Sequence, residues 1–249
     1  MKLLLCGCRG RMGRAVAAIA AEQPDVTVVA GVDLAGGEAA FPVLTHPTEC
    51  TSAVDVVVDF SNPAALEEEL AYVRERRLPL VLATTGLSQE QIALVDAAAQ
   101  EVPVFFSSNM SFGVALLAAL TEKAAAVLGD GYDIEILEMH HNQKLDAPSG
   151  TAKMLAQAAE KGLAFTPDIV YDRHERRQKR DPREIGIASL RGGTVVGQHE
   201  VIFAGRDEVL RLSHEAQSRD IFAVGALRAA RFLLDKPAGL YTMRDLMDQ

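Results

Sequence analysis

Residues 138–151 contain a dense group of side chains that could do chemistry. Two adjacent histidines, His140 and His141, are followed by Lys144, an aspartate and a Ser-Gly-Thr turn. An imidazole exists in both charged and neutral forms near pH 7, so His140 can donate or accept a proton. Lys144 is a cation that can bind a carboxylate or donate a proton itself. These residues predict a site for proton transfer to a small anion.

The end of this stretch predicts a second anion-binding feature. Gly150 and Thr151 open a helix expected over residues 152–161, and backbone N–H groups at a helix start attract anions. Two separate positive features, the lysine and the helix start, indicate a small substrate with two carboxylates.

The histidine pair has two other interpretations, which the residues leave open. One is a metal site with Glu138 and Asp146 nearby, but the spacing matches no zinc motif and we expect no metal. The other is a structural pair, since most histidines do no chemistry. Asp146 could cap the turn before Pro148 and Ser149 could cap the helix, and both roles are compatible with substrate contact.

A glycine-rich turn near the N-terminus predicts a dinucleotide site. A strand expected over residues 2–6 leads into Gly7, Gly10 and Gly13, a helix follows, and a second strand ends in Asp33. This order is typical of the mononucleotide-binding unit of a dinucleotide-binding sheet. Glycines permit a tight turn and close approach to a pyrophosphate, whose charge the helix start attracts. Asp33 is placed to bind the adenosine ribose.

Strands and helices alternate through the first 108 residues. Further short apolar strands are expected over residues 54–59, 79–83 and 102–106. The alternation predicts an α/β fold with a Rossmann-like, doubly wound parallel sheet, whose ligands bind beyond the carboxyl ends of the strands. The residues expected to gather at that edge are Gly7, Cys8, Arg9, Gly10, Arg11, Met12, Asp33, Ala83, Thr84, Thr85, Ser107, Ser108, Asn109 and Met110.

The second half predicts an α+β substrate domain. A long helix over residues 112–128 and a strand over 132–140 come first. Three more strands look antiparallel, so we expect a mostly antiparallel sheet; they span residues 185–191, 195–204 and 208–214.

A helix expected over residues 219–234 should return to the first domain. The predicted division is a dinucleotide-binding domain over residues 1–108 and 218–249, and a substrate-binding and oligomerisation domain over residues 109–217.

Composition limits the classes of protein. The 249 residues are 49% apolar and 24% charged, as in a soluble globular protein, and no apolar run approaches the ~20 residues of a membrane span. The net charge of −9 argues against nucleic-acid binding, and the one basic run, residues 173–180, is interpreted as a solvated loop. Cys6, Cys8 and Cys50 have no nearby base in the sequence, and their odd number fits a reducing cytoplasm.

The two predicted sites together indicate hydride transfer. Reducing a C=C or C=N bond also requires a proton, which His140 could supply. One alternative is a dehydrogenase of a small amino or keto acid. The Ser-Gly-Thr turn after the histidines and the lysine argues against it. Another is a cofactor-sensing regulator, but the sequence has no basic recognition helix.

The chain resembles the dihydrodipicolinate reductase family, also described as 4-hydroxy-tetrahydrodipicolinate reductases. The resemblance rests above all on Glu138-x-His-His-x-x-Lys-x-Asp-Ala-Pro-Ser-Gly-Thr151. It covers nearly the whole length, with shorter matches at residues 7–13, 58–61, 84–86, 189–193, 196–199, 218–219 and 239–245. It implies an NAD(P)H-dependent reduction in lysine and diaminopimelate biosynthesis that gives tetrahydrodipicolinate.

The resemblance also implies roles for the candidate residues. His140 would be the proton donor and acceptor, and Lys144 a proton donor and carboxylate partner. His141, Gly150 and Thr151 would contact the dicarboxylate, and the residues at the sheet edge would bind NADH or NADPH. Family members are usually cytoplasmic homotetramers built through the sheets of the substrate domain.

Two departures from the family pattern bear on the cofactor. A turn usually written Gly-Thr-Thr-Gly begins here with Ala83, whose methyl group could crowd the nicotinamide side. In some members, an arginine directly after the acidic residue pairs with the 2′-phosphate of NADP. Here Leu34 occupies that position, and Asp33 would repel such a phosphate. This predicts a preference for NADH, although Arg9 or Arg11 could compensate.

Overall fold

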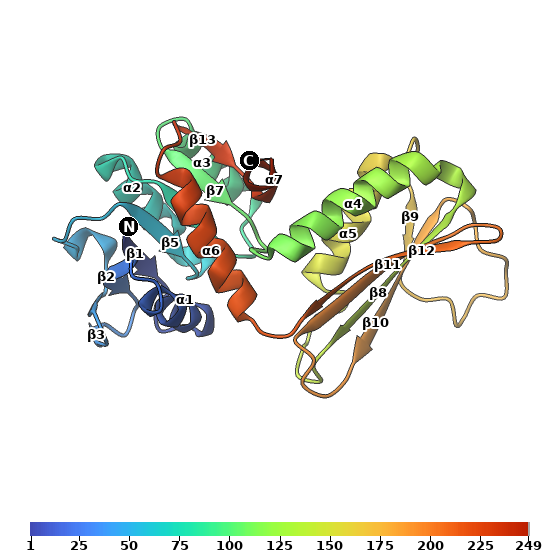
Figure 1. Ribbon diagram of the computed structural model, residues 1–249, viewed down its shortest axis with the longest axis horizontal. Helices are drawn as coiled ribbons and strands as arrows, with labels where there is room; N and C mark the ends of the chain where they lie inside the picture. Colours follow the sequence, from blue (N-terminus) through green and yellow to red (C-terminus); the bar gives the residue numbers. More distant parts are fainter. Residues whose placement is uncertain (249) are drawn as a thin grey trace. The chain divides into compact units, whose positions relative to one another are not determined.

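The computed structural model describes residues 1–248, of which residues 37 and 38 are described by their backbone alone. The chain divides into two compact units (Figure 1). Unit 1 comprises Met1–Phe112 and the segment from Arg219 onward, and unit 2 comprises Gly113–Ser218. The assignment of these units to cofactor and substrate stays a prediction.

Unit 1 is built on one sheet with the strand order β13-β7-β6-β5-β1-β2-β4-β3. Every neighbouring pair is parallel except β4 and β3, which are antiparallel. The expected Rossmann-like doubly wound sheet is therefore confirmed. The strands are β1 (Lys2–Cys6), β2 (Thr27–Val32), β3 (Gly37–Glu38), β4 (Pro42–Leu44), β5 (Val56–Asp59), β6 (Leu80–Leu82), β7 (Pro103–Phe106) and β13 (Gly239–Tyr241).

Helices cover both faces of this sheet because its strands are apolar on both sides. On β7, Val104 faces the core formed with α2 and α3, whereas the Phe105 ring meets Phe232 of α6 edge to face. Helix α6 also packs against α1 (Figure 1). The helices are α1 (Arg11–Ala21), α2 (Leu66–Arg76), α3 (Gln89–Ala99), α6 (Asp220–Leu233) and α7 (Met243–Met247).

Unit 2 has a five-stranded sheet with two helices packed on one face (Figure 1). The strand order is β12-β11-β8-β10-β9. The strands are β8 (Asp133–His140), β9 (Asp168–Val170), β10 (Glu184–Arg191), β11 (Gly197–Ala204) and β12 (Val209–Ala216), and the helices are α4 (Phe112–Leu128) and α5 (Gly150–Gly162). Apolar side chains of both helices meet Ile134, Ile136 and Val201 in a common core.

The pairing of β10 corrects the expectation of a mostly antiparallel sheet. β11 pairs antiparallel with β8 and β12, but β10 pairs parallel with β8 and β9. The connection from β8 to β10 passes through α5, and a helical crossover brings strands together in parallel. β10 and β11 lie on opposite sides of β8, so Gly192 and Gly193 do not form a hairpin turn between paired strands.

Helix α4 is apolar over much of its length. Among the described residues, Phe112–Gly131 is long and apolar enough to cross a membrane by length and composition. A core helix passes the same test, and Leu117 and Ala125 of this segment are buried in the core of unit 2.

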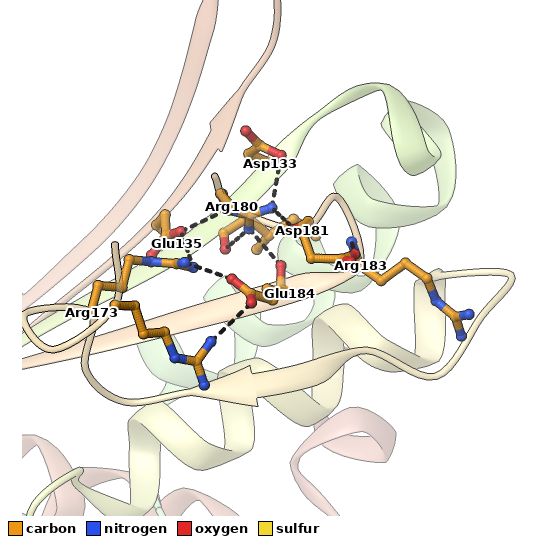
Figure 2. A network of polar contacts seen from close by, with 9 residues as sticks. Asp133, Glu135, Arg173, Arg180, Asp181, Arg183 and Glu184 are labelled. Carbon is orange, nitrogen blue, oxygen red and sulfur yellow. Dashed lines mark hydrogen bonds and ion pairs between the residues drawn. The ribbon is translucent and has the colours of Figure 1, made fainter. Parts of the chain in front are cut away.

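Most of the basic run 173–180 is an exposed loop, as expected, but Arg173 and Arg180 are held in ion pairs (Figure 2). Arg180 donates to Asp133 at 2.7 Å and to Glu135 at 2.9 Å, and its side chain is only 17% exposed. Arg173 pairs with Glu184 at 2.6 Å. The cations neutralise carboxylates at the starts of β8 and β10. They hold this segment against the end of the sheet where these two strands begin.

Candidate active site

His140 is the last residue of β8, on the face of the sheet that α4 and α5 cover. Successive side chains of a strand point to opposite faces, so Glu138 and His140 share the face of Ile134 and Ile136. Glu138 is completely buried and His140 is 9% exposed. The strand therefore places the imidazole at the edge of an apolar core, beside a carboxylate.

Glu138 is surrounded by hydrogen-bond donors. Its Oε2 lies 2.6 Å from His140 Nδ1, and two N–H groups of Arg191 on β10 reach its oxygens at 2.9 and 3.0 Å. The backbone N–H of Ser149 donates to Oε1 at 3.2 Å. Burial raises the pKa of Glu138, but the hydrogen bonds, led by that of Arg191, outweigh it and lower the pKa to about 2. Glu138 is therefore a buried carboxylate anion.

The pKa of His140 lies below its ordinary value. Burial disfavours the charged imidazole, the nearby Glu138 carboxylate opposes this effect, and the charges of Lys144 and Arg191 add to it. The neutral imidazole therefore predominates at pH 7 in the absence of a ligand. A bound anion close to the ring would raise the pKa of His140 again.

A second buried histidine lies against the first. His199 on β11 pairs in register with Glu138, and its ring meets the His140 ring edge to face with centroids 5.1 Å apart. Its Nε2 lies 3.0 Å from Ser149 Oγ. Burial first, and then the neighbouring His140, lower the pKa of His199 to about 4, so this ring is neutral at pH 7.

Lys144 lies in the loop after β8. Its Nζ donates to Asp146 Oδ1 at 2.9 Å, and its backbone N–H donates to the carbonyl of His141 at 3.1 Å. The hydrogen bond from Lys144 is the main cause that lowers the pKa of Asp146. The Asp146 carboxylate thus holds the lysine, and the Asp146 carbonyl accepts a bond from Arg191 at 2.7 Å.

Helix α5 begins at Gly150, as the expected anion-binding helix start requires. Ser149 is its N-cap and accepts a hydrogen bond from Ala152 N at 3.1 Å, which confirms the expected capping role. A Cβ atom added at Gly150 would meet nothing within 4 Å, so open space lies beside the first residue of the helix. Thr151 is the second residue of the helix.

The structure therefore gathers His140, Lys144, Gly150 and Thr151 around the loop that joins β8 to α5. The residues that sequence reasoning missed are Glu138 as a partner of His140, together with Arg191 and His199. Strand alternation could have paired Glu138 with His140, but finding the other two needed the pairing of β8 with β10 and β11. Within the described part of the chain, no group of three or more His, Cys, Asp or Glu side chains could hold a metal ion.

In unit 1 the glycine loop has the shape that a pyrophosphate needs. Gly7 has a φ of 70°, and a Cβ added at Gly13 would come within 2.2 Å of the Gly7 carbonyl oxygen. Gly10 is the N-cap of α1 and supplies no side-chain cap, which leaves the helix start open to an anion. Arg11 and Met12 form the first turn of α1. These residues fit the phosphates of a dinucleotide.

Asp33 lies at the end of β2, beside the glycine loop. Its Oδ2 accepts the backbone N–H of Arg9 at 3.0 Å, and the guanidinium of Arg9 donates to the Gly36 carbonyl at 2.5 Å. A pocket of about 350 Å³ is lined by Gly7, Asp33 and Leu34 among others. Its place at the carboxyl ends of β1, β2 and β5 fits the adenosine half of a dinucleotide.

The other expected cofactor residues follow β6 and β7. Thr84 Oγ1 donates to the buried Asp59 at 2.5 Å, so that hydroxyl is already engaged, while Ala83 is buried and Thr85 is exposed. Ser107 Oγ donates to the carbonyl of Asn109 at 2.7 Å, which folds the turn containing Ser108. Cys8 and Met110 are buried side chains, so only their backbone could touch a ligand.

Fold and sites together define an NAD(P)H-dependent oxidoreductase, with a Rossmann-type unit and a separate unit that carries a histidine, a lysine and an open helix start. The comparisons with known proteins narrow this class. Residues 1–110 match the family described as dihydrodipicolinate reductase, N-terminus, and residues 113–247 match dihydrodipicolinate reductase, C-terminus. The chain belongs to the dihydrodipicolinate reductase family.

Curated relatives match over the whole chain. A 4-hydroxy-tetrahydrodipicolinate reductase of Caldanaerobacter subterraneus subsp. tengcongensis is 48% identical and covers 99% of this chain and 98% of its own length. A reductase of the same name from an Exiguobacterium species is 46% identical and covers 100% and 96%.

Solved structures show the same fold. A dihydrodipicolinate reductase of Paenisporosarcina sp. with dipicolinate bound superposes with a TM-score of 0.81 at 24% identity, covering 97% of both chains. A C. glutamicum DAP dehydrogenase in complex with DAP has a TM-score of 0.57 at 15% identity, covering 98% of this chain and 92% of that one.

Proposed function

We propose that this chain is a 4-hydroxy-tetrahydrodipicolinate reductase, which uses NAD(P)H to give tetrahydrodipicolinate in lysine and diaminopimelate biosynthesis. The observation that carries the proposal is the buried His140 on Glu138, beside Lys144 and the open start of α5. An acid and two anion-binding features in one loop suit the reduction of a dicarboxylate. The names of the curated relatives support this substrate.

Two features bind the substrate carboxylates in this proposal. Lys144 takes one of them, and the backbone N–H groups of Gly150 and Thr151 take the other. His141 contacts the substrate from the same loop. Lys144 is held by Asp146, so the substrate carboxylate shares or replaces that partner.

His140 delivers the proton in this proposal. The cofactor, when bound, supplies a hydride to one atom of the reduced double bond, and the other atom needs a proton. The dianionic substrate raises the pKa of His140, so the imidazolium forms as the substrate binds. The pKa of His140 is then closer to neutral pH, where an imidazole is an effective general acid.

The cofactor site favours NADH in this proposal. Asp33 lines the pocket of the glycine loop, and the residue after it, Leu34, is 88% exposed and carries no charge for a 2′-phosphate. The Arg9 guanidinium donates to the Gly36 carbonyl rather than facing outward as a phosphate partner. We expect kcat/KM to be higher with NADH than with NADPH. A tenfold advantage for NADPH would contradict this preference.

The chain forms a homotetramer in the cytoplasm in this proposal. Helices α4 and α5 pack on one face of the unit 2 sheet. The other face presents Leu137, Met139 and Leu190, the last of them 48% exposed. A sheet face with such apolar side chains is suited to burial against other copies of the chain.

A growth experiment tests the proposed function in a cell. The gene is placed in a bacterium that requires diaminopimelate because it lacks this reductase, and growth is measured without diaminopimelate. We expect growth with the wild-type chain and none with His140→Gln at equal protein levels. Absence of growth with a soluble, folded wild-type chain would contradict the proposal.

A further inference from the structure

We propose that Arg191 and Glu138 form a buried charge pair that positions His140 and decides which of its ring nitrogens carries the transferred proton. The inference rests on the proposed role of His140 in the reduction. It gives Glu138 and Arg191 a positioning role, since neither needs to touch the substrate.

The distance between Glu138 and His140 determines the tautomer. Glu138 Oε2 lies 2.6 Å from His140 Nδ1. An ionised carboxylate only accepts hydrogen bonds, so Nδ1 must hold a hydrogen in both the neutral and the charged imidazole. Nε2 is then the nitrogen that gains and loses a proton. The ionised state of Glu138 follows from its bond to Arg191 and its pKa of about 2.

The carboxylate of Glu138 is fixed in orientation. Arg191 donates to both of its oxygens, and Ser149 N donates to Oε1 at 3.2 Å. The same Arg191 reaches the Asp146 carbonyl at 2.7 Å, which ties the end of β10 to the loop that carries Lys144. Four donors surround this buried carboxylate, and it cannot rotate away from His140 without breaking hydrogen bonds to them.

Gly197 on β11 keeps a side chain away from Nε2 of His140. A Cβ added at Gly197 on β11 would lie 3.1 Å from His140 Nε2 and 3.7 Å from His199 Cε1. The absence of that carbon leaves space beside the nitrogen that carries the exchangeable proton. The charged and titratable groups around His140 are Glu138 on β8, Arg191 on β10, His199 on β11 and Lys144 in the loop.

Buried ion pairs are seldom a source of stability, because desolvating two charges offsets much of their attraction. A pair that also holds an imidazole by Nδ1 matches the arrangement in which a carboxylate orients a general acid–base histidine. The Arg191–Glu138 pair therefore serves the protonation of His140.

A Glu138→Gln variant tests the charge while keeping the size of the side chain. The amide can donate to Nδ1 and so favours the opposite tautomer, with hydrogen on Nε2. We expect kcat to fall by roughly 10²-fold or more with KM changed much less. Loss of the carboxylate also lowers the pKa of His140, so the alkaline limb of the pH profile should move to lower pH.

A double variant separates positioning from a structural role. If Glu138 acts through His140, Glu138→Gln combined with His140→Gln should be no slower than His140→Gln alone, because the effects do not add. Additive losses, or an unshifted pH profile, would overturn the inference. Wild-type kcat in His140→Gln would instead remove the proposed role of His140 itself, so the two failures are distinguishable.

A measurement on the wild-type chain covers the case in which Glu138→Gln does not fold. Nitrogen-15 NMR of labelled histidine, assigned with His140→Gln, reports which ring nitrogen is protonated. We expect neutral His140 to carry hydrogen on Nδ1 with an unprotonated Nε2. A neutral ring protonated on Nε2 would overturn the inference.

Discussion

At the residue scale, the site depends on which charges reach which atoms. Lys144 and Arg191 are both close enough to lower the pKa of His140, yet they have different partners. Arg191 is committed to the buried Glu138, whereas Lys144 holds Asp146, whose side chain is 63% exposed. This difference supports the proposal that Lys144 binds a substrate carboxylate.

Replacing Lys144 by alanine should chiefly weaken substrate binding. A charge-assisted hydrogen bond contributes about 1.5–3 kcal/mol, so we expect KM to rise by roughly tenfold to a hundredfold with a smaller change in kcat. Steady-state kinetics measures both constants, with Lys153→Ala on the exposed side of α5 as the control. A large drop in kcat at unchanged KM would assign proton delivery to Lys144 instead.

The sequence predicted His140, Lys144 and the helix start because they lie within one short stretch with a recognisable pattern. It did not predict that Arg191 and His199 flank His140, since those contacts depend on the register between β8, β10 and β11. Local spacing carries information about residues on one element, and cross-strand neighbours need the pairing itself.

At the element scale, the doubly wound sheet was predictable because its strands are buried on both faces and appear as continuous apolar runs. The strands β3, β4, β9 and β13 were missed, since strands of two or three residues show no periodicity, and only β6 among the strands this short stands out as a continuous apolar run. The parallel pairing of β10 was also missed, because the polar segment after α5 gave no sign of a crossover to the same sheet.

A buried acid on α2 gives a prediction about the stability of unit 1. Glu69 is 3% exposed, and Ser61 Oγ donates to it at 3.3 Å. Burial, followed by the charge of Asp59, raises the pKa of Glu69 well above its ordinary value. A raised carboxyl pKa favours the protonated form in the folded state. The contribution of Glu69 to the free energy of unfolding is therefore fully present below its pKa in the unfolded chain, about 4.3. It is lost as pH rises toward its pKa in the folded protein.

Glu69→Gln should stabilise the protein increasingly as pH rises. The amide keeps the size and a hydrogen bond to Ser61 but cannot ionise, so we expect a gain in stability that is larger at pH 8 than at pH 5. Thermal melts across this pH range measure the difference, with Glu67→Gln at an exposed site of α2 as the control. A melting temperature equal to that of wild type at every pH would contradict the prediction.

At the scale of the whole molecule, the two units carry different parts of the proposed reaction. Unit 1 supplies the glycine loop and Asp33, and unit 2 supplies the acid and the anion-binding loop. The sheet of unit 2 also presents Leu190 and Met139 on the face opposite to α4 and α5. The same unit would thus bind the substrate and join copies of the chain.

Replacing Leu190 by arginine should disrupt the proposed tetramer. A charge in place of this apolar side chain cannot be buried against another copy without a large desolvation penalty. Light scattering after size-exclusion chromatography should give about four times the 26.7 kDa chain mass for wild type and a smaller assembly for the variant. Leu94→Arg on the exposed face of α3 serves as the control. A monomeric wild-type chain would contradict the proposed assembly.

Substrate-dependent oxidation of NADH tests the central claim most directly. The substrate is made fresh from pyruvate and aspartate semialdehyde by the enzyme of the preceding step, and NADH consumption is followed with wild type and His140→Gln. We expect rapid oxidation that requires substrate. In the variant we expect kcat to fall by roughly 10²-fold or more. No substrate-dependent oxidation of NADH or NADPH by the folded wild-type chain would contradict the account.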